Sequence, residues 1–384
     1  MPYEITLSHL PAGYSMSHAK AGEMVQVLVS EFSTTEDGMK FIKRLEGTPR
    51  ELLNALPASA NARESTVDHM LAIIRRDRTA TIYLNELTWI GTIRSKGAIQ
   101  KGDPVTTDSI LDMVTLKPEG VEIPCDAGIV LILSAGWRKG LFFDYGPIVG
   151  DPPKDRNYDL PPAFAAYKAY LLFTETLSLT EAMWTELLRQ SWFPFIHLRQ
   201  ATTRNLVLAL QNGSLIDDLL DEIEIDTKSA VAARLENWKL HPLLQPHFSV
   251  IEAAVKHYGQ GDYLSATLIL YPRIEGVMRS LHFMDPNAPK ASQGNLIATT
   301  VTNAELPPHP YSLLLPVRFE QYLRDVYFAA FNPKNPDGVS RHTVSHGVVP
   351  VSALDRKGAT LGLLTLLQLV AMLPPNPVTK VAGA

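Results

Sequence analysis

The stretch SALDRKGATLGLLTLLQLVAML (352–373) decides how the C-terminal part of the chain folds. Its apolar residues recur every three to four positions, which is the spacing of one helix face. Ser352 or Asp355 can cap the first turn, and a Pro-Pro pair follows the last leucine, so we expect a helix over 354–373. Its apolar core contains Gln368 and is shorter than the about 20 residues that span a bilayer. The stretch therefore predicts a helix buried inside a globular protein.

Three further helices and one short helix are expected before this last one. Apolar spacing places them near 245–258, 262–283 and 311–331, where Pro272 permits a kink in the second, and the short helix around 340–346. The C-terminal part is therefore predicted to be a helical bundle. The side chains on its apolar stripes are expected to be buried: Leu268, Ile269, Ile274, Val277, Leu281, Leu314, Phe319, Leu323, Leu363, Leu366, Leu367 and Val370.

The first 150 residues show a different, mixed pattern. The segment 23–32 predicts a strand, and apolar spacing predicts helices over 39–56, with an interruption at Pro49, and over 65–78. From 80–150 the pattern changes to β, and the run GIVLILSA between two glycines fits a buried strand. We therefore expect a mixed α/β domain over 1–150.

A proline-rich segment, GDPPKDRNYDLPP (150–162), predicts a domain boundary. After it we expect a helical connecting region over 163–240, the helical bundle over 241–374 and a disordered tail over 375–384. The predicted fold class is α+β, with a mixed N-terminal domain followed by a mostly helical part.

Composition excludes several classes of protein. Apolar residues make up 46% of the chain and charged residues 20%, which is incompatible with a disordered protein. The single cysteine, Cys125, rules out a disulfide framework and a cysteine-based zinc site. The chain starts without a basic segment that leads into an apolar run, so we expect no signal peptide, a cytoplasmic location and no membrane partner.

Charge is distributed unevenly along the chain, whose net charge is −5. Residues 1–240 contain 24 Lys and Arg against 31 Asp and Glu, whereas residues 241–384 contain 11 against 9 and hold 7 of the 11 histidines. The C-terminal part is therefore the better place for an anionic substrate and for proton transfer. The acidic run DDLLDEIEID (217–226) is interpreted as a solvated helix face, because no second carboxylate cluster accompanies it to form a metal site.

The segment NPKNPDGVSRHTVSHG (332–347) carries the residues best suited to chemistry. Its proline and glycine residues predict a turn, after which Asp337 or Ser340 can cap a short helix. That helix presents Arg341, His342 and His346 within six positions.

These residue types suit cleavage of a phosphodiester without a metal ion. Arg341 is a permanent cation whose planar fork matches a phosphate, so it can stabilise charge that develops there. Histidine transfers protons near neutral pH, as general acid–base catalysis requires. On an ideal helix, however, Arg341 and His346 lie about 140° apart, so they converge only if the arginine reaches round, the helix is distorted or two chains share the site.

The segment RHTVSH resembles the R-x4-6-H motif of the HEPN superfamily, whose members are small helical bundles. The upstream helix IEGVMR, with Glu275 and Arg279, and the downstream run DRKGATLGLLTLLQLV are also similar to HEPN domains of bacterial toxin and abortive-infection ribonucleases. The resemblance covers 241–374, little over a third of the chain.

The resemblance implies a metal-independent endoribonuclease, a hydrolase that needs no cofactor. In that mechanism His346 is the general base for the ribose 2′-OH, and Arg341 grips the scissile phosphate. His342 is a secondary candidate, as a supporting group or acid, and Glu275 is a further one. The implied partners are single-stranded RNA, a second copy of the chain in a homodimer through the bundle, and an antitoxin or trigger protein. The implied role is that of a toxin or antiviral defence effector, with the N-terminal domain as regulator.

Other interpretations of the same residues remain open. The domain can be a non-catalytic HEPN-like module that binds RNA or protein, which the weak positive charge of the bundle favours. Arg341 can be a structural partner of Glu275 or Asp337. His342 and His346 have the spacing of metal ligands, but no third ligand is evident, so no metal site is expected.

Basic and aromatic residues also alternate near the predicted strands of the N-terminal part. Such residues can stack on nucleic-acid bases, but they can equally form the core of a strand beside a basic turn. The residues in question are Trp137, Arg138, Lys139, Phe142, Phe143 and Tyr145.

Overall fold

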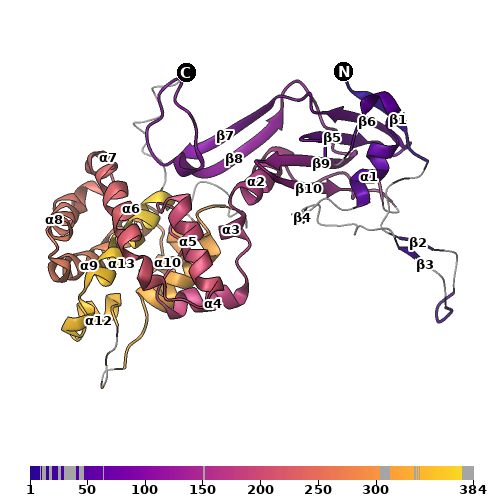
Figure 1. The fold of residues 1–384 in the computed structure, drawn as a ribbon. Helices are drawn as coiled ribbons and strands as arrows, with labels where there is room; N and C mark the ends of the chain where they lie inside the picture. The colour runs from indigo at the N-terminus through magenta and orange to yellow at the C-terminus, as the bar shows by residue number, and fades with distance from the viewer. Residues whose placement is uncertain are drawn as a thin grey trace. The chain divides into compact units, whose positions relative to one another are not determined.

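The computed structural model consists of two compact units, which we describe separately. Unit 1 comprises Met1–Thr92 and Met113–Thr174, and unit 2 comprises Ile93–Asp112 and Glu175–Ala384. Helix accounts for 48% of the chain and strand for 14%, and the two are segregated along it, which confirms the α+β class (Figure 1). The structure describes residues 1–8, 10, 14–16, 20–24, 27–29, 40–42, 47–63, 65–149, 152–302, 312–332, 334, 336 and 338–373.

Unit 1 is built on a six-stranded sheet in which every pair of neighbouring strands is antiparallel. In order across the sheet the strands are β1 (Tyr3–Thr6), β6 (Thr79–Leu84), β5 (Met70–Ile74), β9 (Gly128–Ala135), β10 (Arg138–Asp144) and β4 (Lys40–Ile42). The register places Ile132 of β9 between Met70 of β5 and Leu141 of β10. Two smaller pairs are β2 (Tyr14–Met16) with β3 (Val27–Val29), and β7 (Trp89–Ser95) with β8 (Ile110–Pro118).

The central strands of the six-stranded sheet are buried on both faces. Alternate residues of β5 point to opposite faces, so that Met70 packs against α1 (Gly47–Asn54) and Leu71 packs on the side of α2 (Leu160–Leu172). A strand that is buried on both faces needs apolar residues at every position, which explains the continuous runs MLAII and GIVLILSA.

One helix prediction in unit 1 is wrong, and another is confirmed only for its second half. The segment 65–78 contains β5 and no helix, because a continuous apolar run also satisfies the three- and four-residue spacing of a helix. The segment 39–56 begins with β4, and its helix α1 starts only at Gly47, so that Pro49 lies in the first turn, where its missing N–H costs nothing. The predicted β pattern of 80–150 is confirmed, and β9 has the bounds of the run GIVLILSA.

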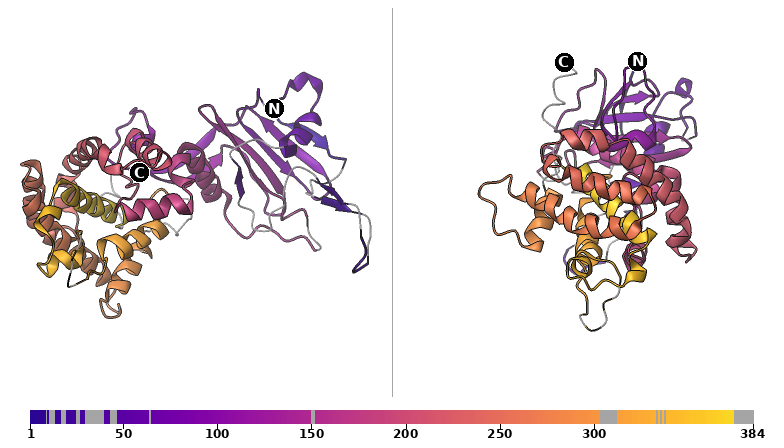
Figure 2. Two further views of the ribbon diagram at one scale, coloured as in Figure 1. Left: turned by 60° about the horizontal axis from the view of Figure 1, so that its bottom comes forward. Right: turned by 90° about the vertical axis from the view of Figure 1, so that its left-hand side faces the viewer.

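Unit 2 is helical, and Figure 2 shows from two further directions that its helices form one body. They are α4 (Glu181–Arg189), α5 (Gln200–Gln211), α6 (Leu220–Ala232), α7 (Leu235–Leu240), α8 (Phe248–Gly259), α9 (Tyr263–His282), α10 (Gln293–Thr302), α11 (Pro316–Tyr322), α12 (Arg341–Ser345) and α13 (Arg356–Met372), preceded by the short α3 (Thr174–Leu177). A π-helical turn, Leu323–Tyr327, continues α11.

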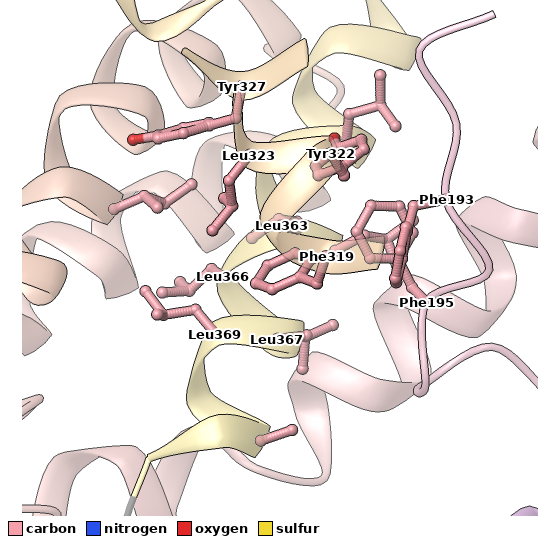
Figure 3. Close-up of a cluster of buried hydrophobic side chains, with 14 of the residues drawn as sticks. Phe193, Phe195, Phe319, Tyr322, Leu323, Tyr327, Leu363, Leu366, Leu367 and Leu369 are labelled. Atoms are coloured by element: carbon pink, nitrogen blue, oxygen red, sulfur yellow. The ribbon is translucent and has the colours of Figure 1, made fainter. Parts of the chain in front are cut away.

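The centre of this body is α13. Phe319 of α11 lies between Phe193 and the leucines of α13, among them Leu367 (Figure 3). Gln368 is fully buried: its Oε1 accepts from the backbone N–H of Ile196 at 2.9 Å, and its Nε2 donates to the carbonyl of Leu314 at 2.9 Å. The one amide in the apolar helix therefore joins three segments of unit 2.

The boundary between the units differs from the expected one near 150–162. Helix α2 follows the proline-rich segment, yet it covers the sheet of unit 1. The helices of 175–240 share one hydrophobic core with those that follow, so they are not a separate connecting region before 241–374. The predicted tail, 375–384, lies outside the described residues.

The predicted bundle helices correspond to α8, α9, α12 and α13, while α11 begins at Pro316, later than expected, and α10 was not predicted. Most of the predicted core residues are buried, and Ile269 and Val370 are half-buried. The prediction for Leu268 is wrong, because this side chain is 41% exposed. The small neighbouring residue Thr267 takes the buried position on that turn of α9. Among the described residues, no helix has the length and apolar character needed to cross a bilayer.

Candidate functional site

Helix α12 holds the motif residues and is fixed at both ends. The hydroxyl of Ser340 accepts from the N–H of Thr343 at 3.2 Å, and the N–H of Ser340 donates to the hydroxyl of Thr343 at 2.9 Å. This reciprocal pair is a capping box, which confirms Ser340 as the cap. Asp337, the other candidate, lies outside the described residues. Gly347 ends the helix with a φ of +68°, a conformation that suits glycine.

One face of α12 anchors the helix, and the rest of it presents the motif. Thr343 and Val344 are buried, and α12 packs against α9 (Figure 1). Arg341 and His342 are half-buried, and His346 is exposed at the helix end. The short helix and its C-cap residue His346 thus hold three candidate side chains at the surface of unit 2.

Arg341 pairs with Glu275, a buried carboxylate on α9. The same carboxylate accepts from Arg279, whose Nε and Nη2 lie 2.9 Å and 2.7 Å from its Oε1. A buried carboxylate without partners would be costly, and two guanidinium groups offset that cost here. The pairing of Arg341 with Glu275 that the sequence left open is therefore present. Two cations share one anion, so the three side chains carry a net charge of +1.

His342 contacts Arg341 through one ring nitrogen and Gln293 through the other. Its Nδ1 lies 3.4 Å from Nη1 of Arg341, and its Nε2 lies 3.4 Å from Oε1 of Gln293. A guanidinium can only donate, so Nδ1 accepts and Nε2 carries the proton. Burial lowers the pKa of His342, and the positive charge of Arg341 and the proximity of His346 lower it further. His342 is therefore neutral near pH 7.

His346 completes the row. Its ring is stacked on His342, with 6.3 Å between centroids and 25° between planes, and it lies 5.7 Å from the ring of Phe331. His342 contacts both Arg341 and His346, so the three side chains follow one another in that order. The structure thus brings together Arg341, His342 and Glu275, with His346 joined to them through His342.

The π-helical turn after α11, which the sequence did not predict, lies next to Arg341, His342 and His346. The hydroxyl of Tyr327 donates to the carbonyl of Tyr271 on α9 at 2.5 Å, and the ring of Phe328 lies 6.0 Å from His342. Burial and the nearby charge of Glu275 raise the pKa of Tyr327 well above its usual range. Such turns are frequent at functional sites, yet no residue pattern in 311–331 distinguishes one from an ordinary helix.

The described residues contain no group of three or more histidine, cysteine, aspartate or glutamate side chains that could hold a metal ion. His342 and His346 are stacked as rings, and the nearby carboxylate of Glu275 is occupied by two arginines. A guanidinium next to two imidazoles offers groups that can bind an anion and transfer a proton.

Two other sequence features have structural roles. Phe142, Phe143 and Tyr145 are fully buried in unit 1, and Lys139 donates to the carbonyl of Val67 at 2.7 Å, so the basic and aromatic stretch is strand core beside a turn. At that turn Trp137 remains 87% exposed.

The acidic run 217–226 is not simply a solvated face. Asp217 pairs with Lys357 at 2.7 Å, and Asp221 pairs with Arg356 at 2.6 Å. These ion pairs join α6 and the turn before it to the first turn of α13.

No family model, curated protein or solved structure matches the chain. A function for this protein therefore rests on the geometry of its own site.

Proposed function

We propose that the protein is a metal-independent endoribonuclease whose site is the row Arg341, His342 and His346 on α12. One observation carries the proposal. The guanidinium of Arg341, paired with the buried Glu275, contacts the first of two stacked imidazoles at the surface of unit 2. The proposed role is that of an RNA-cleaving effector, as a toxin or in antiviral abortive infection, with the N-terminal part as regulator.

In the proposed reaction His346 and Arg341, at the two ends of the row, have different roles. His346 is exposed and takes the proton of the ribose 2′-OH, whose oxygen then bonds to the phosphorus. Arg341 stabilises the charge that develops on the phosphate oxygens. The bond between phosphorus and the 5′-oxygen breaks, that oxygen takes up a proton from water, and His346 returns the proton it accepted to the solvent. The products are a 2′,3′-cyclic phosphate and a 5′-hydroxyl end.

Glu275 and His342 have positioning roles in this proposal. Glu275 orients the guanidinium of Arg341, and Arg279 compensates its charge so that the cluster keeps a net positive charge for RNA. His342, which is neutral and donates to Gln293, holds the ring of His346 by stacking. Neither residue has to exchange a proton with the substrate.

Homodimerisation through the helical unit is part of the proposal. One helix of five residues offers few groups to hold an RNA strand. A two-fold arrangement brings a second Arg341 and a second His346 to the same strand. It also provides a surface that an antitoxin or trigger protein can cover.

The alternative is a non-catalytic module that binds RNA or protein. The observation that favours it is the ion pair itself, because a guanidinium that already has a carboxylate partner binds phosphate less strongly. Incubation of purified protein with single-stranded RNA and EDTA separates the two functions. Cleavage that depends on His346 supports the enzyme, whereas binding that depends on Arg341 without cleavage supports the module.

A further inference from the structure

A second group of charged side chains in unit 2 lines a cavity of about 230 Å³ and shares no residue with the α12 site. Segments far apart in the sequence meet there: the residue after β7, the turn before β8, the segment that leads into α5, and α6 with the two residues after its end. The polar side chains that line it are Lys96, Asp108, His197, Arg199, Asp226 and Arg234.

The carboxylates of the cavity are already engaged. Asp226 is buried, accepts from the N–H of Arg199 at 3.0 Å and pairs with the guanidinium of the same residue. Asp108 accepts from the N–H of Gln200 at 2.7 Å. Both carboxylates satisfy N–H groups at the start of α5, which have no partner within the helix.

The two remaining cations, Lys96 and Arg234, form no ion pair with a carboxylate in the part of the chain that the structure describes. Arg234 donates to the carbonyls of Ala230 and Lys96, each at 2.7 Å, so neutral oxygens rather than a carboxylate hold it. Among the described residues, no carboxylate lies within ion-pair distance of the Lys96 ammonium. Burial lowers the pKa of Lys96 to about 8, against the opposing effect of Asp108, and the charge of Arg234 adds to the lowering. Asp226 also opposes the lowering, but neither Lys96 nor Arg234 forms an ion pair with a carboxylate of the cavity, and two adjacent, half-buried cations of this kind favour an anion between them.

His197 adds an unused hydrogen-bonding group to the same cavity. The residue is only 9% exposed, and its Nδ1 is buried without a hydrogen-bond partner among the described residues. Burial, with the charges of Arg234 and Lys96, lowers the pKa of His197 well below its usual range, so the ring is neutral. Buried polar atoms are nearly always satisfied in native proteins, so this atom points to a ligand.

We infer that this cavity binds a small phosphate monoester, with the phosphate between Lys96 and Arg234 and within reach of His197. A phosphate monoester carries about −1.5 to −2 charges at pH 7, and it suits two cations that form no ion pair in a cavity whose three cations outnumber its two carboxylates. The guanidinium supplies the planar fork that phosphate binding favours.

Volume limits the rest of the ligand. The cavity has room for about eight waters at ~30 Å³ each, which is more than a bare phosphate fills and less than the roughly 300 Å³ of the smallest drug-sized sites. Ile225 and Ala233 provide apolar surface for a few carbon atoms. The ligand class is therefore a phosphorylated sugar or polyol of a few carbons.

Isothermal titration calorimetry at pH 7 tests this inference with glycerol 3-phosphate and ribose 5-phosphate, each against its unphosphorylated counterpart and against orthophosphate. We expect at least one ester to bind at least tenfold more tightly than orthophosphate, and the unphosphorylated compounds not to bind. Lys96→Met should weaken ester binding at least tenfold, and Arg234→Lys should weaken it because the fork is lost. Lys101→Met, at an exposed lysine of the same segment, should leave it unchanged.

A second measurement uses only the unaltered protein, so it does not depend on whether the variants fold. Ester affinity of the unaltered protein should fall as pH rises from 7 to 9, because Lys96 loses its proton while His197 stays neutral and Arg234, whose pKa burial lowers to about 10, keeps most of its charge. Affinity that does not change over this interval, or no ester binding below about 1 mM, overturns the inference. Neither result bears on RNA cleavage, so the inference and the proposed function fail independently.

Discussion

The guanidinium of Arg341 on α12 pairs with the buried carboxylate of Glu275 on α9, and this pair is the foundation of the candidate site. It positions the motif arginine and, with Arg279, creates a net positive charge next to two imidazoles. The same contact can serve catalysis or structure alone, and the following measurements separate these roles.

Replacement of the exposed histidine tests the general base. We expect His346→Ala to reduce cleavage of single-stranded RNA in EDTA by about 10²–10⁴-fold, the usual contribution of positioned proton transfer. A 2′-deoxy nucleotide at the cleaved position should abolish the reaction. His257→Ala, at a histidine on α8, is the matched control and should keep full activity. Full activity of His346→Ala, or equal cleavage of DNA, would contradict the mechanism.

Replacement of Arg341 tests whether a positive charge alone is sufficient for RNA cleavage. Arg341→Ala should lose RNA cleavage, and Arg341→Lys should recover little of it, because lysine keeps the charge without the planar fork. Gel assays under single-turnover conditions measure both. The control Arg204→Ala removes an exposed arginine of α5 and should have no effect. Recovery of wild-type rates by Arg341→Lys would rule out a role for the guanidinium geometry.

Replacement of Glu275 tests whether its buried carboxylate positions Arg341. Glu275→Gln leaves Arg341 and Arg279 without their shared anion, so we expect a loss of about 1–3 kcal/mol in the free energy of unfolding, reduced from the value for a deeply buried pair because both arginines are partly exposed. Urea denaturation measures it. Glu320→Gln removes the half-buried partner of the exposed Arg324 and should cost less than about 1 kcal/mol.

A positioning role also predicts lost activity in Glu275→Gln at a temperature where the variant is fully folded. A lower kcat with an unchanged KM for RNA is the expected pattern. Unaltered kcat in the folded variant would make the Glu275 contact purely structural.

Assembly is measured by light scattering at micromolar concentration. We expect a mass of about twice the chain mass of 42.4 kDa, because two copies of α12 supply the groups that one copy lacks. A monomer mass throughout this range would contradict the shared site, and a test for cleavage by the monomer would then show whether one copy suffices.

The second cavity predicts an unusual dependence of stability on pH. Lys96 has a pKa of about 8 in the folded protein and 10.5 as its ordinary value. Between these values the unfolded chain binds more protons, so this residue makes the ligand-free protein more stable as pH rises. Lys96→Met should remove that increase and stabilise the protein at pH 7 by roughly 1–2 kcal/mol. Urea denaturation at pH 7 and 9.5 tests this, with Lys101→Met as control.

Sequence alone determined the elements whose pattern is local. The three- and four-residue spacing of 352–373 is sufficient to predict α13, because a helix buries a stripe that repeats with its own turn. Ser340 and Gly347 mark the ends of α12, since capping depends on residues within one turn. The α+β class follows from the same local patterns.

Only the tertiary structure decided what depends on distant neighbours. The run MLAII is a strand because α1 and α2 cover both faces of its sheet, whereas its apolar spacing alone predicted a helix. The pair of Arg341 with Glu275, and the meeting of Lys96, His197 and Arg234 around one cavity, join segments far apart in the chain. Local periodicity specifies which face of an element is apolar, but it carries no information about which element packs against that face, and the packing alone places these charges together.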